Sequence, residues 1–455
     1  MNEEDEFGTK QLLSKAIDSS NIEIMSLLIE YANQHQIILE LNEKEQNGNY
    51  PLLQAINHNQ FTYISIIIKN NIEMVKLLIE YANQHQIILE LNEKDSEYGN
   101  YPLLTAISYS NIEVVKLLIE YANQHQIILE LNEKNKGGYY PLLYAIKNNK
   151  IEIVKLLTDY ANQYQIILEL NGKDNDGYYP ILYTIKNNNI EMIKLLIDYA
   201  NQHQIILELN KKKQDGFYPL LSAITCNQSI ILNVEIVKLL IEYANQHQII
   251  LELNEKNKDG EYPLYWATSK NSVEIVKLLI EHANQYQFIL ELNEKDKVGQ
   301  YPLLYAISKN NIEMLKLLIE YANQHQIILE LNEKNKYGEY PLYWATSKNS
   351  VEIVKLLIDH ANQHKIILEL NDKNIYGDYP LLYAIKNNNV EIVKLLIDYA
   401  NQHQILLKYD KNNIFDIFQK NLFVRFLGFK PEIQKLLENY EKEKKRMDKG
   451  KYIKE

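Results

Sequence analysis

The chain has 455 residues, and 48 Lys and Arg against 60 Asp and Glu give it a formal net charge of −12. This acidic balance argues against general nucleic-acid binding, which needs a basic face to neutralise phosphates. Cys226 is the only cysteine, which excludes an internal disulfide and a thiolate metal cage. No secretory signal is visible at the N-terminus, and the apolar stretches are shorter than the roughly 20 residues of a membrane span. We therefore expect an intracellular, cytoplasmic protein without a membrane segment; a nuclear location stays open.

A Tyr-Pro step recurs nine times, with intervals of 51, 39, 39, 39, 44, 39, 39 and 39 residues. The steps begin at Tyr50, Tyr101, Tyr140, Tyr179, Tyr218, Tyr262, Tyr301, Tyr340 and Tyr379. Repetition at a fixed period of this size is typical of a stacked array, in which each unit packs against its neighbours. The repeat therefore outweighs the length as a guide to domain number.

The repeat at residues 138–176 predicts two helices in chain order. Gly138 marks a turn, and Pro141 stands where a first helix would begin, because its fixed φ suits the first helical position. Asn148-Asn149 ends that helix. Apolar residues at helical spacing from Ile151 predict a longer second helix. The segment 166–171 after it fits either a further helical turn or an extended segment, and its period does not decide between them.

The sequence pattern of this repeat resembles that of the ankyrin repeat family. Tyr140-Pro141-Leu142-Leu143-Tyr144-Ala145 is similar to the ankyrin Thr-Pro-Leu-His-x-Ala, and Glu152-Ile153-Val154-Lys155-Leu156-Leu157 is similar to Glu-Ile-Val-x-Leu-Leu at the same separation. The resemblance covers roughly residues 8 to 440 and implies an all-α solenoid of stacked helix-turn-helix repeats. The repeat departs from the family in length, 39 residues against about 33. Tyr also replaces Thr, and Leu or Tyr replaces His, so we expect an apolar, aromatic seam between repeats.

The sequence predicts five segments. They are an acidic leader at 1–7, an N-terminal capping repeat at 8–47, nine repeats at 48–408, a degenerate C-terminal capping repeat at 409–440 and a charged tail at 441–455. We expect the N-terminal cap to have a more polar outer face, because terminal repeats close the apolar stack against water. Two insertions, at 57–70 and 226–233, are apolar, and local packing is the favoured interpretation over a partner-binding flap.

No catalytic or metal site is expected. Eight histidines recur in an Asn-Gln-His step, too far apart in a stack to share one zinc ion. They are His35, His85, His125, His203, His247, His325, His364 and His403. His360 and His364 form an i,i+4 pair without an evident third ligand. Cys226 has no distinctive His or Asp context, and a catalytic triad needs different side chains at one place. We expect no enzyme activity, no cofactor and no small-molecule substrate.

The position after each turn glycine varies most between repeats. Ankyrin repeats bind through the turn tips and the exposed side of the first helix, which implies a partner surface here. The candidate residues are Tyr139, Tyr178 and Phe217 as an aromatic ladder, with Lys147, Lys186 and Tyr98 nearby. The alternative is that these rings only cover neighbouring repeats. The resulting prediction is a monomeric protein-binding scaffold whose partner is unknown. An adaptor or targeting subunit, for example in degradation, that docks through residues 409–455 is the alternative function.

Overall fold

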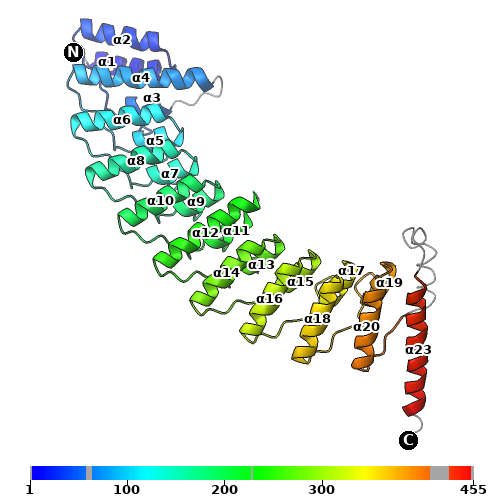
Figure 1. Cartoon of the computed structure of the whole chain (residues 1–455). Helices are drawn as coiled ribbons and strands as arrows, with labels where there is room; N and C mark the ends of the chain where they lie inside the picture. The colour runs from blue at the N-terminus through cyan, green and yellow to red at the C-terminus, as the bar shows by residue number, and fades with distance from the viewer. Residues whose placement is uncertain (1–2, 58–63, 227–228, 410–429, 452–455) are drawn as a thin grey trace. The chain divides into compact units, whose positions relative to one another are not determined.

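The computed structural model describes residues 3–57, 64–226, 229–409 and 430–451, which form α-helices and loops without a strand (Figure 1). The chain divides into two compact units, Met1–Cys226 and Asn227–Glu455. Each unit is a stack of helix pairs, so the expected all-α solenoid is confirmed. No helix within the described ranges combines the length and apolarity needed to cross a membrane.

In the first unit, helix pairs follow one another along the stack. The short first helices are α3 (Pro51–Asn57), α5 (Pro102–Ser108), α7 (Pro141–Lys147), α9 (Pro180–Lys186) and α11 (Pro219–Thr225). The longer second helices are α4 (Ile64–Gln84), α6 (Ile112–His125), α8 (Ile151–Tyr164) and α10 (Ile190–Gln202). The stack is preceded by α1 (Glu3–Asp18) and α2 (Ile22–Gln34), so part of the expected acidic leader is helical.

The second unit repeats this plan. Its first helices are α13 (Pro263–Ser269), α15 (Pro302–Ser308), α17 (Pro341–Ser347) and α19 (Pro380–Lys386). Its second helices are α12 (Ile230–Gln246), α14 (Val273–Gln285), α16 (Ile312–Gln324), α18 (Val351–His364) and α20 (Val390–Gln402), and α23 (Pro431–Lys451) follows α20. The Tyr440 hydroxyl of α23 accepts the Leu407 N–H at 3.0 Å, a bond that Tyr321 and Tyr399 also make in this unit.

Local chemistry sets the helix ends. Each first helix begins with Pro in its first turn, as expected, after an extended Tyr such as Tyr140. The first helix α7, for example, ends before Asn149, which adopts a left-handed conformation with φ 56°. Asn tolerates this conformation better than most residues. Second helices begin at caps such as Asn111, whose side chain accepts the Val114 N–H at 3.2 Å.

The extra residues of the long repeat form an extended return segment. After the left-handed Gln165, residues 166–169 are not helical, which decides between the two alternatives. Leu168 and Leu170 are buried while Ile167 faces outward, the alternation of an extended chain. Side chains of Asn join successive return segments. The amide nitrogen of Asn132 donates to the Ile167 carbonyl at 2.8 Å, and its oxygen accepts the Glu169 N–H at 2.9 Å.

The seam at the Tyr-Pro step is aromatic, as expected, but it is not apolar. Tyr179 is fully buried, and its single hydroxyl proton is shared between the Glu208 and Lys211 carbonyls, both at 2.8 Å from the oxygen. Tyr301 makes the same contact in the second unit, at 2.7 Å to the Glu330 carbonyl. The apolar part of this expectation was wrong, because the phenol brings a donor to the backbone of the return segment that closes its own repeat.

The two insertions lie partly outside the described residues, at 58–63 and 227–228. Their described parts lengthen second helices, because α4 has 21 residues and α12 has 17, against 13 or 14 in the other internal repeats. Ile230 and Ile231 are 51% and 79% exposed. The prediction that this insertion packs locally was therefore wrong for these two side chains.

Candidate partner-binding surface

The turn before the first helix places Tyr139 on the surface of the first unit. The Asn135 side-chain oxygen accepts the N–H groups of Gly137 and Tyr139, at 3.0 and 2.9 Å. Gly138 has φ +80°, and a Cβ there would lie 2.8 Å from the Asp174 Cα of the next repeat. The turn tips therefore pack against one another, which fixes the residue that follows each glycine.

Tyr139 and Lys147 meet across one repeat. The ring of Tyr139 stacks on Tyr144 with centroids 4.4 Å apart, and the Lys147 ammonium lies 4.0 Å from the Tyr139 centroid. The ammonium also donates to the Tyr139 hydroxyl at 2.7 Å. A cation over a ring face is attracted by the ring quadrupole, so lysine and tyrosine hold each other in place.

The next repeat builds the same cluster. Tyr178 stacks on Tyr183 at 4.8 Å, with the Lys186 ammonium 4.8 Å from the Tyr178 centroid. The Tyr183 hydroxyl donates to Asp174 at 2.6 Å. Burial, followed by hydrogen bonds with Asp174 and Tyr139, raises the pKa of Tyr183 well above its ordinary value. This phenol therefore stays protonated and links two repeats.

Phe217 joins the surface through Lys213, whose ammonium lies 4.8 Å from the Tyr178 centroid and 5.2 Å from that of Phe217. The rings of Tyr139 and Tyr178 each stack on a tyrosine of their own first helix, so the expected ladder is connected through lysines. We name this surface the lysine–aromatic strip. It consists of Tyr139, Tyr144, Lys147, Tyr178, Tyr183, Lys186, Lys213 and Phe217. The sequence did not single out Lys213, Tyr144 or Tyr183, because their contacts arise only when the turn and first helix fold together.

Tyr98 is exposed and lies apart from these contacts. It lines a hollow of about 670 Å³ with Asp18, Glu45, Tyr109 and Tyr144. Tyr144 therefore belongs to both the hollow and the strip. The six predicted residues lie on one series of turn tips and first helices in the first unit, and their role in binding stays a prediction.

The second unit has carboxylates at most of the corresponding positions. Asp378 pairs with Lys386 at 2.7 Å and accepts the Tyr383 hydroxyl at 3.2 Å. Glu261 accepts the indole N–H of Trp266 at 3.2 Å. The chemistry after the turn glycine thus changes from aromatic in repeats of the first unit to acidic in repeats of the second.

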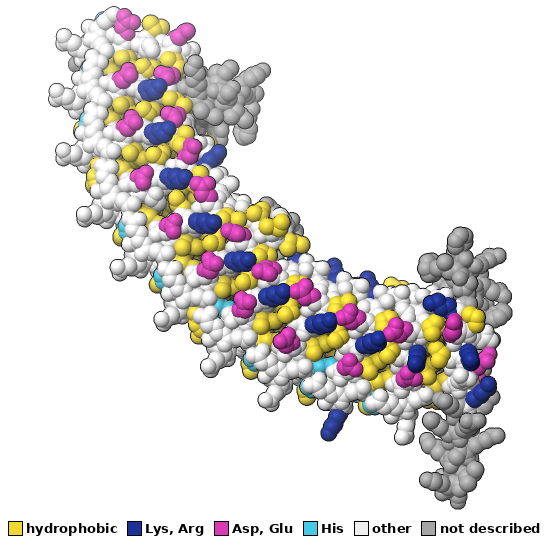
Figure 2. Space-filling model, viewed as in Figure 1, with side chains coloured by type: hydrophobic (Ala, Val, Ile, Leu, Met, Phe, Trp, Pro, Cys, Tyr) yellow, Lys and Arg dark blue, Asp and Glu magenta, His cyan; other side chains and the backbone are white. Residues whose placement is uncertain are grey.

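The opposite surface, formed by the second helices, balances its own charges. Figure 2 shows Lys side chains alternating with Asp and Glu over these helices. Several of these pairs join successive repeats: Lys155–Glu191 in the first unit, and Lys277–Glu313, Lys316–Glu352 and Lys355–Glu391 in the second. Exposed pairs of this kind contribute about 0–1 kcal/mol each, so their main effect is to leave little unbalanced charge there.

The recurring histidines connect neighbouring repeats. For six of them, a ring nitrogen meets an Asn side-chain oxygen of the preceding repeat, at 2.8–3.0 Å. The pairs are His85–Asn33, His125–Asn83 and His203–Asn162 in the first unit, and His325–Asn284, His364–Asn323 and His403–Asn362 in the second. The described part of the chain contains no group of three or more His, Cys, Asp or Glu that could hold a metal ion.

His360 differs from these histidines because it occupies a position that is Tyr in most repeats. It is 2% exposed, and neither ring nitrogen has a hydrogen-bond partner within the described ranges. Burial, and secondarily the neighbouring His364, lowers its pKa from 6.5 to about 4. A neutral ring packed in this way has a structural role. It lies in the joint between two repeats, where a second helix meets the return segment of the preceding repeat.

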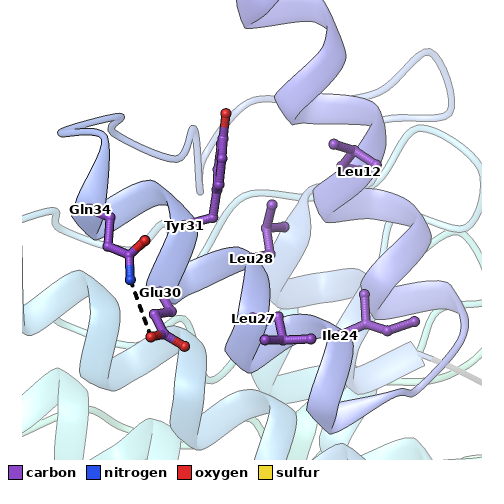
Figure 3. Close-up of a pocket in the computed structure, with 7 residues that line it drawn as sticks. All are labelled: Leu12, Ile24, Leu27, Leu28, Glu30, Tyr31 and Gln34. Carbon is purple, nitrogen blue, oxygen red and sulfur yellow. Dashed lines mark hydrogen bonds between the residues drawn. The ribbon is translucent and has the colours of Figure 1, made fainter.

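The outer face of α1 and α2 is apolar, and the expectation of a more polar cap was wrong (Figure 3). Leu12, Ile24, Leu27 and Tyr31 are 48–64% exposed, whereas Ile153 and Tyr81, which match Ile24 and Tyr31 in other repeats, are 1% exposed. The first helix pair therefore keeps the residues that other repeats use for stacking. Glu30 and Gln34, joined by a 3.3 Å hydrogen bond, border this face.

Comparison with known proteins identifies the class. A family profile described as "Ankyrin repeats (3 copies)" matches residues 64–167, 161–249, 233–327, 287–367 and 322–409. The chain belongs to the ankyrin repeat family, whose repeats generally serve as non-enzymatic protein–protein interaction modules. Among solved structures, an ankyrin repeat domain from Acinetobacter baumannii AYE is 20% identical, with a TM-score of 0.37 over 49% of this chain and 98% of that one. No curated protein matches the chain.

Proposed function

We propose that the protein is a binding scaffold that holds a partner protein on the turn tips and first helices of its first unit. The observation that carries this proposal is the lysine–aromatic strip, where half-buried Tyr139, Tyr178 and Phe217 lie beside lysines. Aromatic residues are enriched in interface cores and dominate binding energy. Stacking and cation–ring contacts already order these side chains, so this protein would lose little side-chain entropy when a partner binds.

Site-specific photo-crosslinking tests this proposal. A benzophenone amino acid replaces Tyr98 or Lys186 on the proposed surface, or Lys155 on the second-helix surface as the matched control. In cell extract, we expect a specific crosslinked protein from positions 98 and 186 that unlabelled protein competes away. It should be lost when Tyr139, Tyr178 and Phe217 are all replaced by Ala. Equal crosslinking from position 155, or retention in the triple variant, would contradict the proposed surface.

An adaptor that docks through residues 409–455 is the second candidate. Within this region Ile433 is fully buried, and the Tyr440 hydroxyl donates to the Ile405 carbonyl at 3.2 Å. Because α23 thus covers the stack, deleting it would expose core residues of α20. Substitution of exposed Lys435 and Glu438 by Ala is therefore the cleaner test. Loss of a partner in this variant, with crosslinks at positions 98 and 186 unchanged, would favour the adaptor role.

A further inference from the structure

Two repeats of this chain form a natural pair of variants. Residues 138–149 and 377–388 share the sequence Gly-x-Tyr-Pro-Leu-Leu-Tyr-Ala-Ile-Lys-Asn-Asn and differ only at x, which is Tyr139 in one and Asp378 in the other. The backbone is the same in both, because Gly138 and Gly377 have φ of +80° and +83° and both first helices begin at Pro. The contacts of the lysine with residue x can therefore be compared directly between the two repeats.

The difference between Tyr139 and Asp378 changes which group contacts the lysine ammonium. In the second unit, the Lys386 ammonium meets the Asp378 carboxylate at 2.7 Å. In the first unit, the equivalent Lys147 contacts the hydroxyl and ring of Tyr139 and forms no ion pair within the described ranges. An ammonium has three donors, so Lys147 keeps hydrogen-bonding capacity beyond this bond.

Lys186 is in the same situation one repeat further on. It is exposed, and its ammonium lies 4.8 and 5.9 Å from the centroids of Tyr178 and Tyr183. The nearby Asp174 is occupied, because it accepts the Tyr183 hydroxyl at 2.6 Å and the Tyr178 N–H at 2.9 Å. The strip thus presents two lysines, in consecutive repeats, without a carboxylate of their own.

We propose that the lysine–aromatic strip binds an extended acidic segment of a partner protein, whose carboxylates meet Lys147 and Lys186 as Asp378 meets Lys386. This inference rests on the proposed function and adds the chemistry of the partner. Stacked helices lie about 8–10 Å apart, and an extended peptide advances about 3.3 Å per residue. Acidic residues about three positions apart in the partner would therefore reach successive lysines, while residues between them contact the rings.

A peptide fits this strip better than a nucleic acid does. Lys213, the third lysine, already pairs with Asp215. Asp18 and Glu45 line the adjoining hollow, so the positive surface is short and ends where the hollow begins. Two unpaired ammonium groups suit a segment with a few spaced carboxylates, whereas nucleic-acid binding needs many phosphate contacts.

The test measures fluorescence anisotropy of labelled peptides with the full chain. The probe is a peptide of four Glu-Gly-Ser triplets, and the comparison peptides carry Gln or Lys in place of Glu. A labelled 12-nucleotide single-stranded DNA covers the alternative anion. We expect the Glu peptide to bind about tenfold more tightly than the Gln peptide, which corresponds to about 1.4 kcal/mol from two charge contacts. This difference should shrink in high salt.

Three variants locate the binding. Lys147→Gln with Lys186→Gln should abolish the preference for Glu over Gln. Tyr139→Asp, which reproduces the residue of the repeat at 377, should weaken it because an internal carboxylate then competes for Lys147. Lys155→Gln on the second-helix surface is the matched control and should change nothing. Circular dichroism confirms that each variant is folded.

Equal binding of the Glu and Gln peptides would overturn the inference, as would tighter binding of the DNA or an equal effect of Lys155→Gln. These outcomes are separate from the crosslinking result. A partner that crosslinks at positions 98 and 186 but lacks an acidic segment would support the scaffold and refute the acidic peptide.

Discussion

His360→Tyr is expected to stabilise the second unit. In neighbouring joints the equivalent tyrosine hydroxyl makes two hydrogen bonds to the return segment of the preceding repeat. Tyr399 accepts the Leu368 N–H and donates to the Ile366 carbonyl, both at 3.1 Å. The matching partners of residue 360 are the Leu329 N–H and the Ile327 carbonyl. The imidazole makes neither bond, because its ring nitrogens have no partner within the described ranges.

The size of the effect follows from these two bonds. A typical protein hydrogen bond contributes about 0.5–1.5 kcal/mol net, so two should raise the local free energy of unfolding by about 1–3 kcal/mol. The substitution also removes two buried, unsatisfied ring nitrogens. Because a repeat contacts only its neighbours, the gain should concentrate in the repeats that adjoin this joint.

The pH dependence gives a second, independent signature. The folded-state pKa of His360 is about 4, below its ordinary value of 6.5, because burial disfavours the charged ring. The unfolded chain therefore binds a proton more readily. The contribution of His360 to stability is complete above about pH 6.5 and is lost as the pH falls through about 4. Tyr at position 360 should remove this part of the acid destabilisation.

Trp344 lies in the same repeat and offers a local probe. In a Trp266→Phe background, its fluorescence reports guanidinium unfolding near position 360, since the chain has two tryptophans. We expect a higher midpoint for His360→Tyr, a smaller loss between pH 6.5 and 4, and slower amide exchange at Leu329. The reverse substitution, Tyr321→His, should lower stability in the adjoining joint. An unchanged midpoint with unchanged Leu329 exchange would refute this reasoning.

Three further predictions concern other contacts of the array. Asn132→Ala should lower the free energy of unfolding by about 1–3 kcal/mol, because it removes two bonds between return segments, and faster amide exchange at Glu169 should locate the loss. Tyr179→Phe should cost about 1–3 kcal/mol by leaving the Glu208 and Lys211 carbonyls without this donor, and an unchanged denaturation midpoint would contradict this. Ile153→Ala should cost about 2–5 kcal/mol, whereas Ile24→Ala on the exposed face of α2 should cost less than about 0.5 kcal/mol; equal losses on denaturation would show that this face is covered in solution.

The sequence predicted the helix pairs because their signals are local. Pro141 fixes the start of the first helix α7. Asn149 ends it, because Asn can adopt the left-handed backbone conformation found there. The conformation of the return segment could not be predicted, because a run such as Ile166-Ile167-Leu168 fits both a helix and an extended segment. Its extended form is held by Asn132, whose partners stand 35 and 37 residues away.

The candidate surface was predicted only in part, for the same reason. Variation after the turn glycine identified Tyr139 and Tyr178. Whether a ring there stacks, covers a neighbour or stands free depends on which side chain the first helix presents, such as Tyr144 or Lys147. The Tyr-Pro seam shows the opposite error, since the replacement of the family's Thr and His by Tyr and Leu suggested an apolar contact, and the hydroxyl of Tyr179 makes it polar.

The unpaired ring of His360 has a mechanical consequence. In the second unit, Tyr321 and Tyr399 each hold a joint through two backbone bonds, and His282 accepts one, from the Leu251 N–H at 3.3 Å. The joint at His360 lacks both bonds. A pulling experiment on this unit should therefore show its first rupture there, and acid should lower the force required. The imidazole at position 360 would thus determine which joint of the second unit breaks first.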